Sequence, residues 1–351
     1  MTDLNAYGWN DRLDKLKQQS GHHGLIHGRV AIVHRDCYEI VSANGQFQCE
    51  LTKNMLLGKP ASKLPCTGDW VLFQTNGSSK GTIVDMLPRE KTLYRRKNGK
   101  VSEKQAIASH IDKAFIVQSL DSNFNMRRAE RFMIQILEAD ILPALVLTKA
   151  DLAFNWTAIE KQTGHIARHM PIYVTSIHRP DTIHPLRESI KEGETVVFTG
   201  SSGVGKSSLV NTLCGKPLLP AAGISPSTGK GRHTSTRREM VLMEGAGVLI
   251  DTPGVREFGL ALENPDSLAK SLDISDYAKS CRFRNCEHIG EPGCAVQEAV
   301  RNGLLEPETV GNYRKLHREA QHFAASAHER RQKEKSFSRL VSEVKKNRKN
   351  R

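Results

Sequence analysis

The hydrophobic positions of this 351-residue chain change their spacing between its N-terminal and central parts. Between residues 24 and 90, apolar residues form short runs that are rich in β-branched and aromatic side chains and are separated by turn residues, a pattern typical of strands. The expected strands cover residues 25–33, 37–41, 46–51, 69–73 and 81–85. Asn44-Gly45 is a typical two-residue hairpin turn. Five short strands in succession predict a small β-barrel of the oligonucleotide-binding (OB) kind.

From about residue 105, buried-type strands alternate with helical patterns, the clearest helix being expected at residues 126–139. The expected strands cover residues 114–118, 143–147, 171–176, 195–199, 238–243 and 247–254. Strands that alternate with helices predict an α/β domain with a mostly parallel sheet covered on both faces.

The two ends of the chain have weaker patterns. Near the N-terminus, Leu4, Tyr7, Leu13 and Leu16 fit either a short amphipathic helix or a frayed extension. After Pro307, a helix is indicated by apolar residues at helical spacing, namely Val310, Tyr313, Leu316, Ala320, Phe323 and Ala327. Residues 330–351 carry ten Lys or Arg against two Glu, which predicts a basic tail, either helical or disordered until it meets RNA.

The charge balance narrows the class of partner. The net charge is +13 and the isoelectric point is near 9.4, which favours a polyanionic partner, nucleic acid before membrane, over a merely soluble basic surface. Basic residues concentrate on the loops and exit of the barrel, at Lys53, Lys59, Lys63, Arg89, Lys91, Arg95, Arg96, Lys97 and Lys100. They fit RNA phosphate contacts or, alternatively, a solvated surface and linker.

Several expectations concern the compartment. No apolar run approaches the roughly 20 residues of a membrane helix, and the N-terminus has no apolar signal segment. The seven cysteines are sparse except for three near residue 290, which suits a reducing compartment. We therefore expect a cytoplasmic protein with no membrane partner, and we expect a monomer.

A glycine-rich loop carries the strongest chemical signal. Residues 200–207 read Gly-Ser-Ser-Gly-Val-Gly-Lys-Ser and fit the phosphate-binding pattern GxxxxGK[ST]. An apolar strand precedes the loop and a helix follows it, which argues against a chance glycine turn. Backbone N–H groups and the helix N-terminus would cradle a polyphosphate. The predicted phosphate contacts are Gly200, Ser201, Ser202, Gly203, Val204, Gly205, Lys206, Ser207 and Ser208, with Lys206 on the β- and γ-phosphates and Ser207 on Mg²⁺.

Three further segments resemble the motifs of GTPases. Thr148-Lys-Ala-Asp151 resembles [NT]KxD, whose carboxylate accepts from guanine N1–H and its exocyclic amine, and Lys149 would pack along the base. Thr175-Ser176 lies where the loop that contacts guanine O6 belongs. Asp251-Thr-Pro-Gly254 resembles DxxG, with Asp251 holding Mg²⁺ through water and the Gly254 N–H facing the γ-phosphate.

These motifs occur in an unusual order. In Ras-like GTPases the phosphate loop comes first and the [NT]KxD segment last, whereas here residues 148–151 precede residues 200–207. The same sheet can form if the termini have moved, since chains tolerate permutation at exposed loops. The chain therefore resembles the circularly permuted GTPases.

A compact set of metal ligands follows the α/β domain. Cys281, Cys286, His288 and Cys294 have the spacing C-x4-C-x-H-x5-C, and three thiolates with one imidazole form a closed tetrahedral Zn²⁺ set. The alternative is a group of ordinary buried cysteines beside a surface histidine. Because no ligand position stays open, the predicted zinc is structural.

The combined features resemble the RsgA/YjeQ family of ribosome-small-subunit-dependent GTPases over about residues 24–325, a likeness sharpened by Gly229–Thr234 and Asp251–Glu257. The resemblance implies a late assembly factor that binds the small ribosomal subunit and its rRNA, and that hydrolyses GTP when the subunit stimulates it.

The expected domains are an extension (1–23), an OB barrel (24–100), a permuted GTPase domain (101–265), a zinc-binding helical domain (266–330) and a basic tail (331–351).

The expected catalytic residues are Lys206, Thr234 and His233, with Thr234 also on Mg²⁺. Ras-like proteins orient the attacking water with a Gln directly after DxxG, but this chain has Val255 there. His233 is the best internal candidate for placing the water, and an exposed histidine without that role is the alternative.

Two other classes of protein fit part of this sequence less well than a GTPase. An ATP-dependent P-loop kinase or ATPase is disfavoured by Asp151, because adenine offers no matching pair of donors. An RNA-binding protein with a vestigial nucleotide site is disfavoured by the presence of Lys206, Ser207, Thr234 and Asp251.

Overall fold

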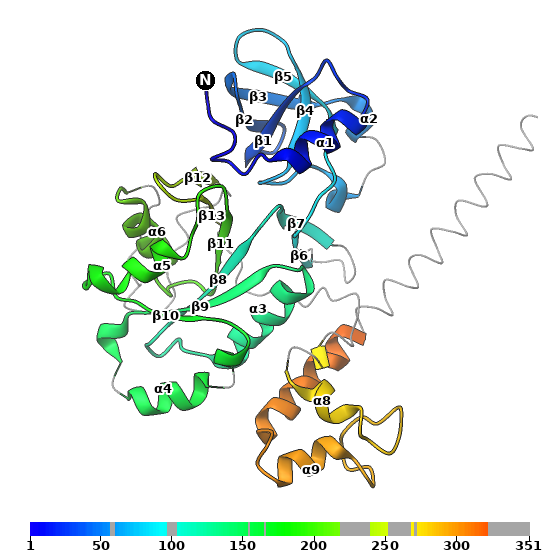
Figure 1. The fold of residues 1–351 in the computed structure, drawn as a ribbon, viewed down its shortest axis with the longest axis vertical. Helices are drawn as coiled ribbons and strands as arrows, with labels where there is room; N and C mark the ends of the chain where they lie inside the picture. Colours follow the sequence, from blue (N-terminus) through cyan, green and yellow to red (C-terminus); the bar gives the residue numbers. More distant parts are fainter. Residues whose placement is uncertain are drawn as a thin grey trace, which may run out of the picture. The chain divides into compact units, whose positions relative to one another are not determined.

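The structure, a computed structural model, describes residues 1–56, 60–96, 104–153, 155–164, 166–217, 239–251, 268–269 and 272–321. The chain forms two compact units (Figure 1). The first comprises Met1–Arg95 and Gln105–Phe258, and the second comprises Arg96–Lys104 and Gly259–Arg351. Among the described residues, no helix is both long enough and apolar enough to cross a membrane.

The N-terminal part of the first unit is a closed five-stranded barrel with the strand order β1-β2-β3-β5-β4 (Figure 1). Its strands are β1 (Ile26–Val33), β2 (Tyr38–Ser42), β3 (Gly45–Leu51), β4 (Trp70–Thr75) and β5 (Lys80–Met86), and the short helices between β3 and β4 are α2 (Lys53–Leu56) and η1 (Ala61–Lys63). Alternate side chains fill the interior, among them Val30, Ile40, Phe47, Phe73 and Ile83. All five strands expected from the sequence are confirmed, and so is the barrel.

Residues before the barrel are packed against it. Helix α1 (Asp11–Gln19) begins after Asn10, whose side chain accepts from the N–H groups of Arg12 and Leu13. Leu4 and Leu13 are buried in a cluster with Trp70. The N-terminal helix is therefore present, but it starts later than the apolar pattern suggested, because Leu4 lies in the turn that precedes it.

Two buried charged side chains join the barrel to the α/β domain. The guanidinium of Arg29 donates to the carbonyl oxygens of Gly68 (3.0 Å), His110 (3.3 Å) and Tyr7. Burial lowers the pKa of Arg29 to about 10, so it stays charged near neutral pH. Asp69 pairs with Arg89 at 2.6 Å and accepts from the hydroxyl of Ser109 at 2.5 Å.

The α/β domain is built on a six-stranded sheet with the order β10-β9-β8-β11-β13-β12, in which only β12 is antiparallel. Its strands are β8 (Lys113–Ser119), β9 (Leu142–Thr148), β10 (Ile172–Val174), β11 (Thr195–Thr199), β12 (Met240–Leu242) and β13 (Val248–Asp251), and a separate two-stranded sheet pairs β6 (Leu93–Arg96) with β7 (Lys104–Ala108). The mostly parallel sheet expected from the sequence is confirmed.

Helices cover this sheet (Figure 1). They are α3 (Met126–Glu138), η2 (Ala150–Leu152), α4 (Trp156–Thr163), η3 (Ile166–Arg168), η4 (Pro180–Thr182), α5 (His184–Glu188) and α6 (Lys206–Cys214). Leu186 of α5 and Leu209 of α6 pack in one buried cluster with Phe115, Val146 and Phe198 of the strands. At the sheet edge, Ile32 of β1 forms a β-bridge with Glu239, so the barrel touches this sheet beside β12.

The described part of the second unit contains α8 (Ile274–Ala278), α9 (Ala295–Arg301) and helical residues 307–321. Val296, Val310, Leu316 and Ala320 are buried. The helix expected after Pro307 is confirmed as far as residue 321. The basic tail, Lys59, Lys97 and Lys100 lie outside the described residues.

Candidate nucleotide-binding site and metal centre

The predicted nucleotide contacts gather at the carboxyl ends of the parallel strands. The glycine loop connects β11 to α6, while Thr148 ends β9 and Asp251 ends β13. Thr175 and Ser176 follow β10 directly. Parallel α/β sheets bind ligands at this edge. His233, Thr234, Gly254 and Val255 lie outside the described residues.

The glycine loop has a backbone that only glycine adopts readily. Gly200, Gly203 and Gly205 have φ values of 148°, 82° and 88°. At Gly200 a side chain is also excluded by space, since a Cβ there would lie 2.4 Å from the carbonyl oxygen of Val117. The loop can therefore pass close to β8 and expose its own backbone to a ligand.

The [NT]KxD-like segment holds the glycine loop by side-chain contacts. The Thr148 hydroxyl donates to the Val204 carbonyl at 2.6 Å, and the Lys149 ammonium donates to the Gly203 carbonyl at 2.8 Å. Lys149 also pairs with Asp121 at 2.7 Å. The two predicted motifs, more than 50 residues apart in sequence, therefore form one structural unit.

Lys206 lies inside the loop. Its ammonium donates to the carbonyl oxygens of Gly200 (2.7 Å) and Ser201 (2.6 Å). Burial lowers its pKa to about 8, and the nearby carboxylate of Asp251, only 3% exposed, works in the opposite direction. Phosphate oxygens would give this buried cation a stronger partner than carbonyl dipoles do.

Asp151 is exposed and is oriented by its neighbour. Its Oδ1 accepts from the Ser176 hydroxyl at 2.5 Å, a bond that lowers the pKa of Asp151. The backbones are joined too, because the Ala150 N–H donates to the Thr175 carbonyl at 3.1 Å. Arg179, in the same loop, adds positive charge that also lowers the pKa of Asp151. The result is an ionised acceptor that faces solvent and can take two donors from a base.

Sequence reasoning missed three contacts from the segment between β8 and α3. Asp121 holds Lys149, Asn123 donates to the Ser202 carbonyl at 3.1 Å, and Arg128 donates to the Ser201 hydroxyl. None belongs to a recognised motif. The only available signal was the run of polar residues directly after a buried strand, which is where ligand-binding loops begin.

The four predicted zinc ligands converge in the second unit. One ligand atom from each of Cys281, Cys286, His288 and Cys294 lies within 4.8 Å of all the others. The His288 Nδ1 is 3.7 Å from the Cys281 sulfur and 3.5 Å from the Cys294 sulfur. Tetrahedral Zn²⁺ bonds would place such atoms about 3.6 Å apart, so the donor set fits this ion.

The surroundings of the cluster support a metal. Burial lowers the pKa of His288, which favours the neutral form that a metal requires. The backbone of His288, at a φ of 59°, is fixed by Gln297, whose amide donates to its carbonyl at 2.6 Å. The Glu291 carboxylate accepts from the N–H groups of Gly290, Glu287 and Ile289, which lowers its pKa to about 2 and ties the loop together.

The strand order and the site together define the class of protein: an α/β domain of the GTPase type in which β9, the strand that ends in the [NT]KxD-like segment, precedes the glycine loop, as in circularly permuted GTPases. The chain belongs to the RsgA GTPase family, whose family model matches residues 86–261.

Individual relatives cover nearly the whole chain. The chain is 62% identical over 348 residues to the small ribosomal subunit biogenesis GTPase RsgA 1 of Bacteroides thetaiotaomicron, covering 99% of this chain and 98% of the relative. Two crystal structures share the fold. YjeQ from Thermotoga maritima matches with a TM-score of 0.63 at 23% identity, over 85% of this chain and 99% of the other. YloQ, described as a circularly permuted GTPase, matches with a TM-score of 0.61 at 24% identity, over 86% and 96%.

Proposed function

We propose that the chain hydrolyses GTP to GDP and phosphate as a factor in the biogenesis of the small ribosomal subunit, acting in the cytoplasm and stimulated by that subunit. The observation that carries the GTP specificity is the exposed Asp151 carboxylate, oriented by Ser176 beside a glycine loop that Lys149 and Thr148 hold in place. The ribosomal role rests on the name of a relative that is 62% identical over almost the entire chain.

The residues of the site have distinct proposed roles. Lys206 would exchange the carbonyls of Gly200 and Ser201 for the β- and γ-phosphates. Ser207, Asp251 and Thr234 would hold Mg²⁺, whose charge neutralises the phosphates as the leaving group departs. The N–H of Gly254 would face the γ-phosphate.

The isolated chain lacks the side chain that orients the attacking water in Ras-like GTPases. Val255 has no hydrogen-bonding side chain where Ras-like proteins carry Gln. We propose that His233, adjacent to Thr234, orients the water when the subunit stimulates hydrolysis.

Turnover with ribosomal subunits tests this function. The isolated protein should hydrolyse GTP slowly, and purified small subunits should raise the rate by at least about tenfold, because a group supplied in trans to a GTPase can add several orders of magnitude. The measurement is phosphate release with small subunits, large subunits or neither. Lys206→Ala should remain inactive throughout. Equal rates with and without small subunits would refute the proposal, and preferential ATP turnover would favour a different P-loop enzyme.

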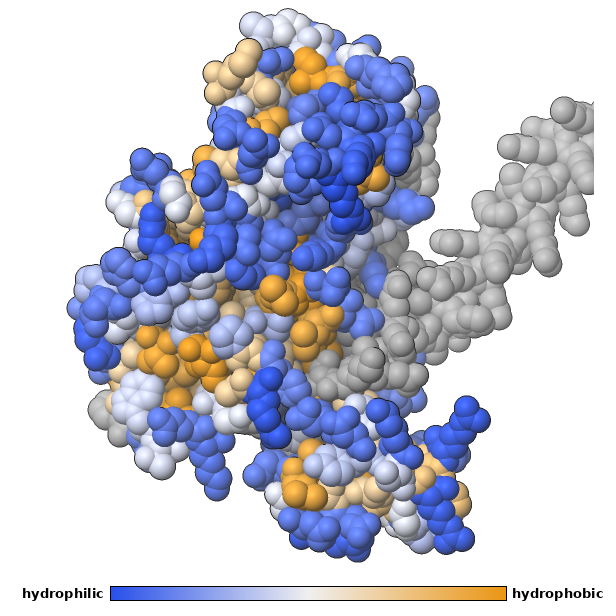
Figure 2. Space-filling view, in the orientation of Figure 1, coloured by the Kyte–Doolittle hydropathy of each residue, from blue (hydrophilic) through white to orange (hydrophobic). Residues whose placement is uncertain are grey.

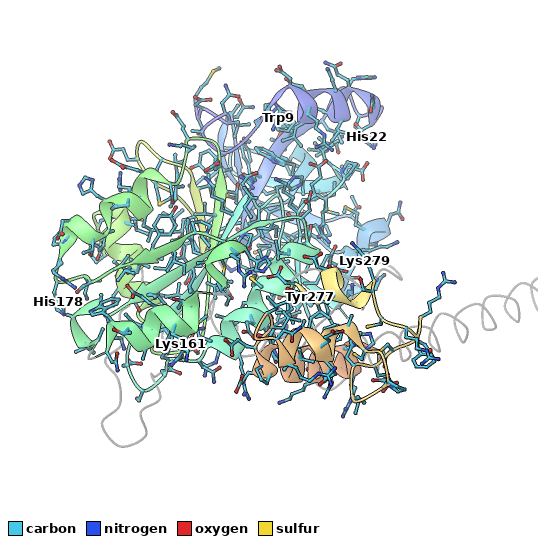
Figure 3. All side chains as sticks on the ribbon, turned by 60° about the horizontal axis from the view of Figure 1, so that its bottom comes forward. Trp9, His22, Lys161, His178, Tyr277 and Lys279 are labelled. Atoms are coloured by element: carbon cyan, nitrogen blue, oxygen red, sulfur yellow. The ribbon has the colours of Figure 1, made fainter. Side chains whose placement is uncertain are left out.

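A basic and aromatic loop in the second unit is suited to rRNA. Residues 279–285, called here the zinc loop tip, contain Lys279, Arg282, Phe283 and Arg284 and no acidic residue. Phe283 is 42% exposed, and the Arg282 guanidinium lies 5.5 Å from its ring centroid. Lys279 comes directly after α8 at the start of this loop (Figure 3). We propose that an unpaired base stacks on Phe283 while the arginines contact phosphates.

Phe283→Ala is expected to weaken small-subunit binding about 5- to 150-fold at fixed salt, since stacking on an aromatic side chain contributes about 1–3 kcal/mol per base. The measurement is the affinity of the chain with a non-hydrolysable GTP analogue. Ile289→Ala is a matched control, because Ile289 is an equally apolar, 55% exposed residue of the same module that lies beyond the zinc loop tip. Equal losses from both substitutions would argue against stacking at Phe283.

The barrel offers a second surface of similar chemistry. The face of the molecule in view is mainly hydrophilic, with apolar side chains in separate patches (Figure 2). Lys53 of α2 and Lys63 of η1 are exposed basic residues in the connection between β3 and β4. We propose that these residues also contact rRNA phosphates, with the protein acting as a monomer.

A further inference from the structure

The glycine loop is fixed through three consecutive carbonyl oxygens. The Ser202 carbonyl accepts from Asn123 at 3.1 Å, the Gly203 carbonyl from Lys149 at 2.8 Å, and the Val204 carbonyl from Thr148 at 2.6 Å. Thr148 is the last residue of β9, Lys149 follows it directly, and Asn123 lies in the segment between β8 and α3. The outer side of the loop is therefore bound to the neighbouring strand ends at three successive peptide groups.

Because the peptide group is planar, these bonds to the carbonyls also fix the direction of the following N–H groups. In a planar trans peptide, the N–H of the next residue points opposite to the carbonyl. Carbonyls held outward at residues 202, 203 and 204 thus aim the N–H groups of Gly203, Val204 and Gly205 toward the interior of the loop. Successive N–H groups in such a concavity form an anion-binding nest.

Two of the donors, Thr148 and Lys149, belong to the predicted base-contacting motif, and the third does not. Two hydrogen bonds fix Asn123. Its backbone N–H donates to the Asp121 carboxylate at 2.9 Å, and its side-chain Oδ1 accepts from the Arg128 guanidinium at 3.0 Å. Because a guanidinium only donates, Arg128 fixes which end of the amide faces it and leaves Nδ2 to donate to Ser202. Arg128 also donates to the Ser201 hydroxyl.

We propose that Asn123 and Arg128 are positioning residues that aim the Gly203 N–H at the phosphates of the bound guanine nucleotide. Asn123 acts on the Ser202–Gly203 peptide, and Arg128 acts by orienting Asn123 and by fixing the preceding residue, Ser201. Neither touches the nucleotide itself. The inference rests on the proposed GTPase function, and it concerns phosphate binding rather than choice of base.

The test is the affinity for GDP, measured with a fluorescent GDP analogue and by competition with unlabelled GDP. Asn123→Asp keeps the shape of the side chain and places a second acceptor against the Ser202 carbonyl. It should weaken GDP binding about tenfold, near the upper range for loss of one hydrogen bond. Arg128→Ala should weaken it by a smaller factor, and Arg128→Lys should restore part of the loss. The preference for GDP over xanthosine diphosphate should not change, because Asp151 reads the base.

Asn125 supplies the matched control. It caps α3 by accepting from the Arg128 N–H at 3.1 Å, and no described hydrogen bond joins it to the glycine loop. Asn125→Ala should lower the melting temperature through loss of the cap, yet leave GDP affinity within twofold. The double substitution Asn123→Asp/Arg128→Ala should lose less affinity than the sum of the two single changes, because both act through one peptide.

The outcomes distinguish failure of the proposed GTPase function from failure of the proposed positioning role. If the parental chain binds no guanine nucleotide, the proposed function falls. If the parental chain binds GDP and Asn123→Asp and Arg128→Ala bind it equally well, the positioning role is refuted. Losses that follow the melting temperature across all variants, Asn125→Ala included, would also refute it, because they would show a general effect on stability.

Discussion

Asp151→Asn is expected to weaken GTP binding about 100-fold and to make xanthosine triphosphate the better ligand. The carboxylate can accept from both guanine N1–H and the exocyclic amine, and each charge-assisted bond contributes about 1.5–3 kcal/mol. An amide in its place presents a donor that suits the additional carbonyl of xanthine. Dissociation constants for GTP and xanthosine triphosphate, measured for the parental chain and the variant, check this result.

Asp181→Asn is a suitable control, because Asp181 is an exposed carboxylate of η4 in the chain segment that follows Ser176. It should leave both affinities unchanged. If Asp151→Asn kept the same ratio of affinities as the parental chain, guanine would have to be recognised by another group, and the assignment of GTP as the substrate would lose its structural basis.

Cys286→Ser is expected to remove the metal and to unfold residues 272–321. The purified parental chain should carry about one Zn²⁺, and the binding energy of a structural zinc, about 10–16 kcal/mol in small modules, is also their folding energy. The variant should retain little zinc. Elemental analysis gives the metal content, and limited proteolysis reports on the second unit.

GDP affinity should persist in Cys286→Ser, because the first unit has its own buried core around Phe115, Val146 and Phe198. Cys37→Ser serves as a control, since Cys37 is a half-buried thiol of the barrel region, remote in sequence from the cluster. A parental protein that contained no zinc and still resisted proteolysis across residues 272–321 would disprove the structural metal.

The features that can be predicted from the sequence are those that depend on short stretches of consecutive residues. The barrel strands follow from runs of β-branched residues and from the hairpin signal of Asn44-Gly45, although the structure places the turn at Ala43 and Asn44 and begins β3 at Gly45. The glycine loop follows from eight consecutive residues. The metal ligands lie within fourteen residues, so their spacing alone brings them together. In each case, residues that are close together in the sequence determine the local structure.

Long-range contacts escaped prediction for the opposite reason. Asn123 and Ser202 are 79 residues apart, and nothing near either residue indicates the other. The apolar spacing near the N-terminus does not reveal where α1 starts, because Gly8 has a φ of 85° and packs so closely on Gly193 that a Cβ would lie 2.8 Å from the Gly193 carbonyl oxygen. The apolar spacing of Leu4 and Tyr7 resembles a helix, but this contact with the α/β domain ends that pattern.

The buried Arg29 has a consequence for how the protein is divided into fragments for expression. Its three carbonyl acceptors come from the N-terminal segment (Tyr7), the barrel (Gly68) and the α/β domain (His110). A barrel fragment that ended near residue 100 would lose the last acceptor and would also part Asp69 from Ser109. A truncated chain of that kind leaves buried charges short of partners, a costly arrangement. A fragment of residues 1–258 keeps every one of these acceptors, although it also carries residues 96–104, which belong to the second unit.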